Sequence, residues 1–204
     1  MKKLPEKTVE RLSQYRRALL NSLTEGKHHI FSHELANLLH ITPVQVRRDI
    51  MFINYSGSLR QGYDVHDLSD TIGKILDTKD GQKVAVVGVG NLGRALIGYF
   101  GGKRTKLTIV AAFDNNPEKV NRVYAGVQCY PAEKLPEIIK TMNISMAILT
   151  VPATEAASVA EILVDAGIKG ILNYTPRPIN VPSHVYLQEY DMITSIEKVA
   201  YFIK

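Results

Sequence analysis

The chain has 204 residues, 45% of them hydrophobic and 22% charged, so it can bury one large core or two small ones and is not a disordered or fibrous protein. The first residues are charged, and the apolar runs are much shorter than the roughly 20 residues of a spanning helix. These features predict a cytoplasmic protein with no membrane partner. The single Cys129 excludes an intramolecular disulfide. The net charge of +5 lies entirely in residues 1–62, which hold ten Lys and Arg against five acids. A basic segment joined to a neutral remainder is typical of a DNA-binding module fused to a second domain.

Apolar periodicity predicts three helices near the N-terminus. The first carries an apolar stripe over residues 9–23 and ends near Gly26. The second is short, with Ser32 as its cap, and runs to Leu39. The third has a stronger start signal, because Thr42 supplies a hydroxyl at the N-cap, proline follows, and Gln45 stands at the third helical position, which together form a capping box.

The third helix has the features of a recognition helix. Val46, Ile50 and Ile53 are expected to face inward, while the opposite face displays Gln45, Arg47, Arg48 and, further round, Asp49 to solvent. Two short helices joined by a three-residue turn favour a helix-turn-helix, and residues 55–65 alternate loosely around two glycines, as in a two-stranded wing. The forked guanidinium of arginine fits guanine and phosphate alike. The candidate DNA contacts are therefore Arg47, Arg48 and Arg60, together with the polar residues Ser32, Thr42 and Gln45. The alternative is a solvated amphipathic helix.

A change in glycine content separates two domains. Residues 65–76 have helical periodicity and are followed by the polar segment 77–81, and seven of the 14 glycines lie between Gly81 and Gly102. We therefore expect a winged-helix domain over residues 1–80, a nucleotide-binding domain over 81–192, and a separate terminal helix over 193–204.

The glycine-rich segment follows a β-branched run and precedes a helical pattern. It reads Gly88-Val89-Gly90-Asn91-Leu92-Gly93, where the first glycine allows a tight turn, the second lets the backbone approach a pyrophosphate, and the third lets the helix pack closely on the sheet. A second predicted strand, residues 107–113, ends at Asp114. A carboxylate there would accept hydrogen bonds from the adenosine ribose and repel a 2′-phosphate, which favours NADH and NAD+ as cofactors. The alternative is that Asp114 only caps a turn before Pro117.

Strands and helices continue to alternate through the second domain. Helices are expected over residues 132–141 and 153–166, and strands over 144–151 and 170–173, which predicts an α/β, Rossmann-type parallel sheet with helices on both faces. Ligands bind at the carboxyl ends of such strands, so Thr150, Val151, Pro152 and Asn173 are candidates for the nicotinamide end. The amphipathic helix over 193–204 either covers a sheet edge or packs on another subunit.

This order of parts resembles one family, the NADH-responsive Rex repressors of bacteria, from about Leu4 to Phe202. The most specific stretches are residues 11–17 (RLSQYRR), 45–49 (QVRRD), 87–93 (VGVGNLG) and 166–174 (AGIKGILNY). The resemblance implies a homodimer on double-stranded operator DNA, with winged helices, Rossmann cores and a C-terminal helix exchanged between subunits. It also implies a switch formed by Arg17, Tyr99 and Asp191, with Tyr99 near the nicotinamide.

Two positions depart from the family pattern. Leu59 stands where the family wing has an arginine, with Arg60 one residue later, and Asn116 stands where the family commonly has a second acid after Asp114. The expected function is a repressor, not an enzyme, that binds a palindromic operator when NADH is low and releases it when NADH binds. The alternative is an NAD-dependent oxidoreductase with an N-terminal accessory domain. Against it, five of the six histidines lie in the first 66 residues, and no metal site is expected.

Overall fold

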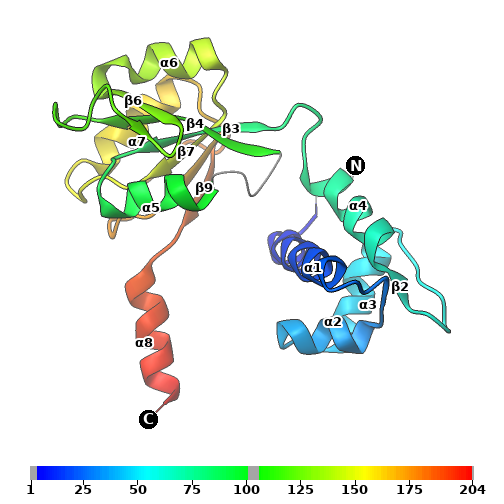
Figure 1. Ribbon diagram of the computed structural model, residues 1–204. Helices are drawn as coiled ribbons and strands as arrows, with labels where there is room; N and C mark the ends of the chain where they lie inside the picture. Colours follow the sequence, from blue (N-terminus) through cyan, green and yellow to red (C-terminus); the bar gives the residue numbers. More distant parts are fainter. Residues whose placement is uncertain (1–3, 101–105, 204) are drawn as a thin grey trace. The chain divides into compact units, whose positions relative to one another are not determined.

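In the computed structural model, which describes residues 4–100 and 106–203, the chain forms two compact units, Met1–Lys79 and Asp80–Lys204 (Figure 1). The first unit contains four helices and a small antiparallel sheet. Its elements are α1 (Glu6–Thr24), β1 (His29–Ile30), α2 (Ser32–Leu39), α3 (Pro43–Phe52), β2 (Tyr63–Asp64) and α4 (Val65–Leu76). The apolar stripes of the four helices converge on one core, which includes Leu12, Leu19, Leu35, Val46, Ile50, Leu68 and Ile72.

Two local details of the first unit differ from the sequence prediction. Ser32 is the first residue of α2, and Phe31 is its N-cap, so the prediction of Ser32 as the cap was wrong. The predicted wing is also paired differently, because Tyr63 pairs with Ile30 of β1, and only a bridge between Ser58 and Gly62 closes the loop itself. The turn from α2 to α3 passes through a left-handed residue at position 40, which ends α2.

The second unit is built on a seven-stranded sheet. Its elements are β3 (Gln82–Val87), α5 (Asn91–Phe100), β4 (Leu107–Asp114), β5 (Val123–Tyr124), β6 (Val127–Pro131), a 3-10 turn (Ala132–Lys134), α6 (Leu135–Met142), β7 (Met146–Leu149), α7 (Ala156–Asp165), β8 (Gly170–Asn173), β9 (Tyr186–Glu189) and α8 (Met192–Phe202). The strand order is β5-β6-β4-β3-β7-β8-β9, and every neighbouring pair is parallel except β5 with β6. The α/β fold class is therefore confirmed.

The two faces of this sheet are covered unequally. Helices α6 and α7 pack on one face, where they enclose the larger core around Phe113, Leu149 and Leu163 (Figure 1). Helix α5 packs on the other face and leaves an apolar groove of about 290 Å³ over β3, β4, β7, β8 and β9, beside Ile148 and Leu172. Helix α8 projects from the end of β9 and buries none of its described residues. It does not cover a sheet edge of its own unit, and Lys204 lies outside the described residues.

Candidate nucleotide site and DNA-binding surface

The glycine-rich loop joins β3 to α5 with three glycines in three different environments. Gly88 has a φ of +98°, and a Cβ there would lie 2.6 Å from the Thr150 carbonyl oxygen, so only glycine fits. A Cβ on Gly93 would lie 2.0 Å from the Gly88 carbonyl oxygen, whereas one on Gly90 would meet nothing within 4 Å. Gly88 and Gly93 thus permit close backbone packing, and Gly90 borders open space. Helix α5 begins at Asn91, directly after Gly90, and the first N–H groups of a helix lack helical partners, as a phosphate site requires.

Asp114, at the end of β4, is 6% exposed and is fixed by three donors. Its Oδ2 accepts the Val89 N–H at 2.7 Å and lies 3.1 Å from Lys119 Nζ, and its Oδ1 accepts the Asn116 N–H at 2.9 Å. Burial opposes ionisation, but the hydrogen bonds from Asn116 and Val89, with the Lys119 charge, outweigh it and hold the pKa of Asp114 below its ordinary value. The carboxylate is therefore ionised beside the glycine loop, as a ribose-binding acid must be.

A pocket of about 300 Å³ opens between the glycine loop, β4 and the start of α7. Six of the predicted cofactor residues line it: Gly88, Gly90, Asp114, Thr150, Val151 and Pro152. Seven further lining residues were not predicted: Val87, Phe113, Asn115, Lys119, Ala132, Glu155 and Val159. Val87 and Phe113 lie at the ends of strands β3 and β4. The other five come from loops and from helix starts, where no sequence period marks which side chains face inward. The pocket therefore combines a phosphate cradle, an ionised acid and an apolar end, and this combination suits a dinucleotide such as NADH.

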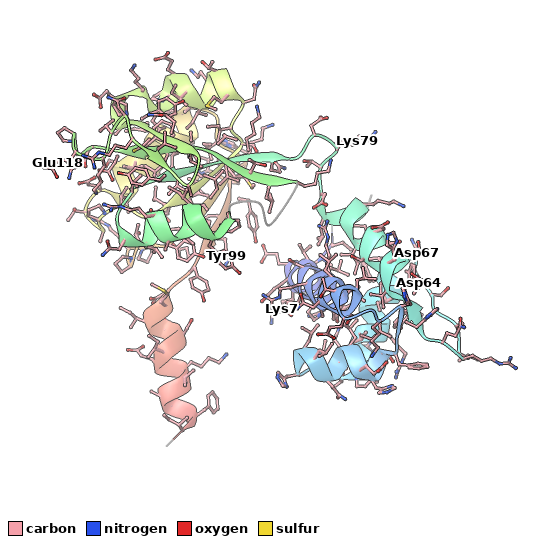
Figure 2. The ribbon with its side chains drawn as sticks, viewed as in Figure 1. Lys7, Asp64, Asp67, Lys79, Tyr99 and Glu118 are labelled. Atoms are coloured by element: carbon pink, nitrogen blue, oxygen red, sulfur yellow. The ribbon has the colours of Figure 1, made fainter. Side chains whose placement is uncertain are left out.

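The other predicted cofactor residues do not line this pocket. Val89, Asn91, Leu92 and Gly93 belong instead to the loop and to the start of α5. Thr150, which does line the pocket, also ties β7 to the loop by donating its hydroxyl to the Gly88 carbonyl at 2.7 Å. Asn173 is buried, donates to the Arg177 carbonyl at 2.9 Å and accepts the Thr175 hydroxyl at 2.8 Å, so its side chain orders the loop after β8. Tyr99 lies near the end of α5 (Figure 2) and is 61% exposed. Its ring packs edge-on against Phe100.

The recognition helix α3 presents both arginines at its surface. Arg47 donates from Nη1 to the Ser32 hydroxyl at 3.0 Å, which joins α3 to the start of α2, and Arg48 is exposed. Thr42 caps the helix by accepting the Gln45 N–H at 3.2 Å. The second half of the predicted capping box is absent here, because the Gln45 side chain donates to Asp49 at 3.0 Å instead.

Asp49 is buried, not solvent-facing, so the prediction for this residue was wrong. It is 3% exposed and accepts hydrogen bonds from Arg11 Nε at 2.6 Å, Arg11 Nη2 at 2.8 Å, the Tyr15 hydroxyl at 2.8 Å and Gln45. Burial has the largest single effect on the pKa of Asp49 and raises it, but these hydrogen bonds and the Arg11 charge together lower it below its ordinary value. The carboxylate thus locks the recognition helix to α1.

The wing is a short closed loop. Ser58 and Gly62 exchange backbone hydrogen bonds of 2.8 and 2.9 Å, and Ser58 accepts the Gln61 N–H at 3.0 Å. This leaves Leu59 and Arg60 exposed at the tip. Between the wing, Arg47 and the start of α2 lies a hollow of about 380 Å³, in which Arg47, Ser32 and Ser58 are polar and the rest of the lining is mainly apolar.

The predicted switch residues occupy three separate elements. Arg17 is exposed on α1, and Tyr99 lies near the end of α5. Asp191 is the N-cap of α8, where its carboxylate accepts the Ile193 N–H at 2.9 Å and the Thr194 hydroxyl at 2.6 Å. Hydrogen bonds from Thr194 and Ile193 lower the pKa of Asp191. Their joint action stays a prediction.

Residues 4–100 and 106–203 contain no helix long and apolar enough to cross a membrane. Nor do those residues bring together three or more His, Cys, Asp or Glu side chains in a group that could hold a metal ion.

A helix-turn-helix unit and a dinucleotide-type Rossmann unit in one chain define a nucleotide-regulated, DNA-binding class of protein. Family comparisons agree with both units, because residues 3–50 match "Putative DNA-binding protein N-terminus" and residues 79–177 match "CoA binding domain". The chain is 39% identical over 201 residues to the redox-sensing transcriptional repressor Rex of Lactobacillus acidophilus, covering 98% of this chain and 95% of that one. It is 38% identical over 202 residues to Rex of Bacillus licheniformis, covering 99% and 94%. The chain belongs to the Rex family of redox-sensing transcriptional repressors.

Solved structures of this family match the whole chain. RSP, a Rex-family repressor, in complex with β-NAD+ and operator DNA is 28% identical with a TM-score of 0.89, covering 100% of this chain and 94% of RSP. RSP in complex with β-NADH is 29% identical with a TM-score of 0.87, covering 100% and 95%.

Proposed function

We propose that this chain is a cytoplasmic repressor, not an oxidoreductase, that binds a palindromic operator and releases it when NADH occupies the Rossmann unit. The observation that carries the proposal is the ionised Asp114 held against the glycine loop in a chain that also presents Arg47 and Arg48 on a recognition helix. The complexes of RSP with NAD+, NADH and operator DNA support it. We retain the divisions 1–80, 81–192 and 193–204 and the switch of Arg17, Tyr99 and Asp191 within this proposal.

The energetic requirement for such a switch is modest. To shift the chain about a hundredfold between operator-competent and incompetent forms, NADH needs roughly 2.7 kcal/mol of differential affinity for those forms. NADH and NAD+ differ by a hydride, so they differ in the positive charge of the nicotinamide ring. The apolar part of the pocket around Val151, Pro152 and Val159 disfavours a cation through its desolvation cost, which supports a preference for NADH.

The first test titrates NADH into the full chain bound to a labelled palindromic operator, on a fixed NAD+ background, and follows fluorescence anisotropy. We expect release at low NADH and slow or no consumption of NADH in the same cuvette. Specific binding that ignores NADH would contradict the sensing proposal, and steady oxidation of NADH with a simple carbonyl would favour the oxidoreductase alternative.

Two variants separate the functions of the units in that experiment. Arg48→Ala is expected to weaken operator binding by about 1–3 kcal/mol, because an exposed arginine of a recognition helix reads a base edge, while NADH affinity stays unchanged. Asp114→Ala is expected to weaken NADH binding and to leave operator binding in the absence of NADH unchanged. Equal loss of both activities in either variant would contradict the assignment of functions to units.

We also propose that the chain is a homodimer in which α8 packs on the bare sheet face of a second copy. The apolar side chains Ile193, Ile196, Val199 and Ile203 form one stripe and are between 60% and 79% exposed. The groove beside Ile148 and Leu172 is apolar and is not covered by the described residues of the same chain. Burial of these two surfaces against each other gives a favourable association of the kind that obligate dimers use.

Ile196→Asp is therefore expected to convert the dimer to a monomer at micromolar concentration in sedimentation velocity, because it places a charge at the centre of the stripe. Lys198→Asp is the matched control, since it introduces the same side chain on the opposite side of α8. The control is expected to stay dimeric. Two dimeric variants would show that α8 does not form the interface.

A further inference from the structure

Lys119 has a position in the nucleotide pocket that the predicted NADH site does not use. It follows a tight turn after β4, in which the Asn116 carbonyl accepts the Lys119 N–H at 2.9 Å and the Asn116 side chain accepts the N–H of Glu118 at 2.9 Å. This turn returns the Lys119 side chain toward the sheet. Its ammonium lies 3.1 Å from Asp114 Oδ2, and the side chain is 25% exposed and lines the pocket.

The Lys119 ammonium changes the charge that an adenosine ribose would meet. A lone Asp114 presents one negative charge at the 2′-position, which repels a 2′-phosphate. With Lys119 in contact, the pair carries a net charge near zero, and Asn116 adds no second acid. The Val89 N–H and Lys119 also occupy Oδ2, so only part of the carboxylate remains for ribose hydroxyls.

We propose that Lys119 is a specificity-determining residue of this site: it offsets Asp114 and pairs with an adenosine 2′-phosphate, so that NADPH is only partly rejected. A 2′-phosphate carries close to two negative charges and offers three acceptor oxygens, which an ammonium already held at the pocket wall can engage with little loss of side-chain freedom. The inference rests on the proposed function, because it concerns the nucleotide that this pocket selects.

The test is isothermal titration of the full chain and of Lys119→Met with NADH and with NADPH. Methionine keeps an unbranched side chain only one atom shorter than that of lysine and removes its charge. We expect the ratio of the NADPH Kd to the NADH Kd to rise about tenfold or more in Lys119→Met, because a charge-assisted hydrogen bond to NADPH is lost and Asp114 gains a free oxygen for the ribose. Lys169→Met, an exposed lysine at the opposite end of the sheet, is the control and is expected to leave the ratio unchanged.

A second variant tests the same electrostatics without removing Lys119. Asn116→Asp keeps the side-chain oxygen that accepts the Glu118 N–H and adds a negative charge, so it is expected to raise the ratio several-fold. An unchanged ratio in Lys119→Met, or an equal weakening of both nucleotides, would overturn the inference while leaving NADH sensing intact. Failure of the unmodified chain to bind NADH at all would instead refute the proposed function, and the inference with it.

Discussion

Asp49→Ala is expected to destabilise the first unit by about 3 kcal/mol and to weaken operator binding at least tenfold. The substitution removes the acceptor of four hydrogen bonds and leaves the Tyr15 hydroxyl, which belongs to a fully buried side chain, without its partner. It also leaves the Arg11 guanidinium without its counter-charge in a partly buried position. Because Asp49 joins α3 to α1, its loss lets the recognition helix change its tilt. Differential scanning calorimetry of the full chain and operator anisotropy well below the melting point measure the two effects separately.

Glu34→Ala provides a comparison within the same unit. Glu34 pairs with Lys27 at 2.6 Å and accepts the Phe31 N–H at 2.7 Å, but both charged side chains are at least one-third exposed. Exposed pairs and caps of this kind contribute about 1 kcal/mol. A loss from Asp49→Ala no larger than that from Glu34→Ala would show that the buried network does not hold the helix.

The effect of Asp49 is also expected to depend on pH. Because the folded chain holds the pKa of Asp49 below its unfolded value of about 4, the carboxylate stabilises the fold fully above that value and loses its contribution as the pH falls through the folded pKa. The difference in melting temperature between the unmodified chain and Asp49→Asn should therefore be constant from neutral pH down to about pH 5 and should narrow below about pH 4. A difference that widens in acid would contradict the ionised state.

Elements with local signals were predicted closely from the sequence. Strand β8 and the end of β4 at Asp114 agree with the predicted residues, because the apolar pair of β8 follows a glycine and the β-branched run of β4 ends at an acid before proline. Strands β5, β6 and β9 were missed. Strands β5 and β6 are short, and their pairing comes from β4 for β6 and from β6 for β5. Strand β9 follows a loop rich in proline and is mostly exposed, so its alternation is weak.

The error at Asp49 had a signal in the sequence. Val46, Asp49, Ile50 and Ile53 follow the i, i+3, i+4, i+7 spacing of one helix face, so the period placed the acid with the buried residues. The charge of Asp49 nevertheless led to a solvent-facing prediction. Its partners Arg11 and Tyr15 lie 38 and 34 residues away in the sequence, so no neighbouring residue indicated that the charge would be paired. The position of Lys119 in the pocket had no such signal, because a turn and not a helix period directs it. Burial of a charge is decided by tertiary partners, which a local pattern does not contain.

Gly93→Ala is expected to cause the largest loss of nucleotide binding, at least a hundredfold in NADH affinity by titration calorimetry. The added Cβ would lie 2.0 Å from the Gly88 carbonyl oxygen and 3.1 Å from the Thr150 hydroxyl, so either the glycine loop or the start of α5 must move. The glycine loop and the start of α5 together form the phosphate cradle. Overpacking of this kind costs about 1–3 kcal/mol in stability.

Gly98→Ala makes the same substitution five residues later in the same helix. Its Cβ would meet nothing within 4 Å, so the variant is expected to bind NADH normally and to gain up to about 1 kcal/mol from the better helix propensity of alanine. The two alanines should thus shift the melting temperature in opposite directions. Normal NADH binding by Gly93→Ala would mean that the loop backbone can move with no loss of affinity. It would also mean that the close packing of α5 on the loop does not form the phosphate site.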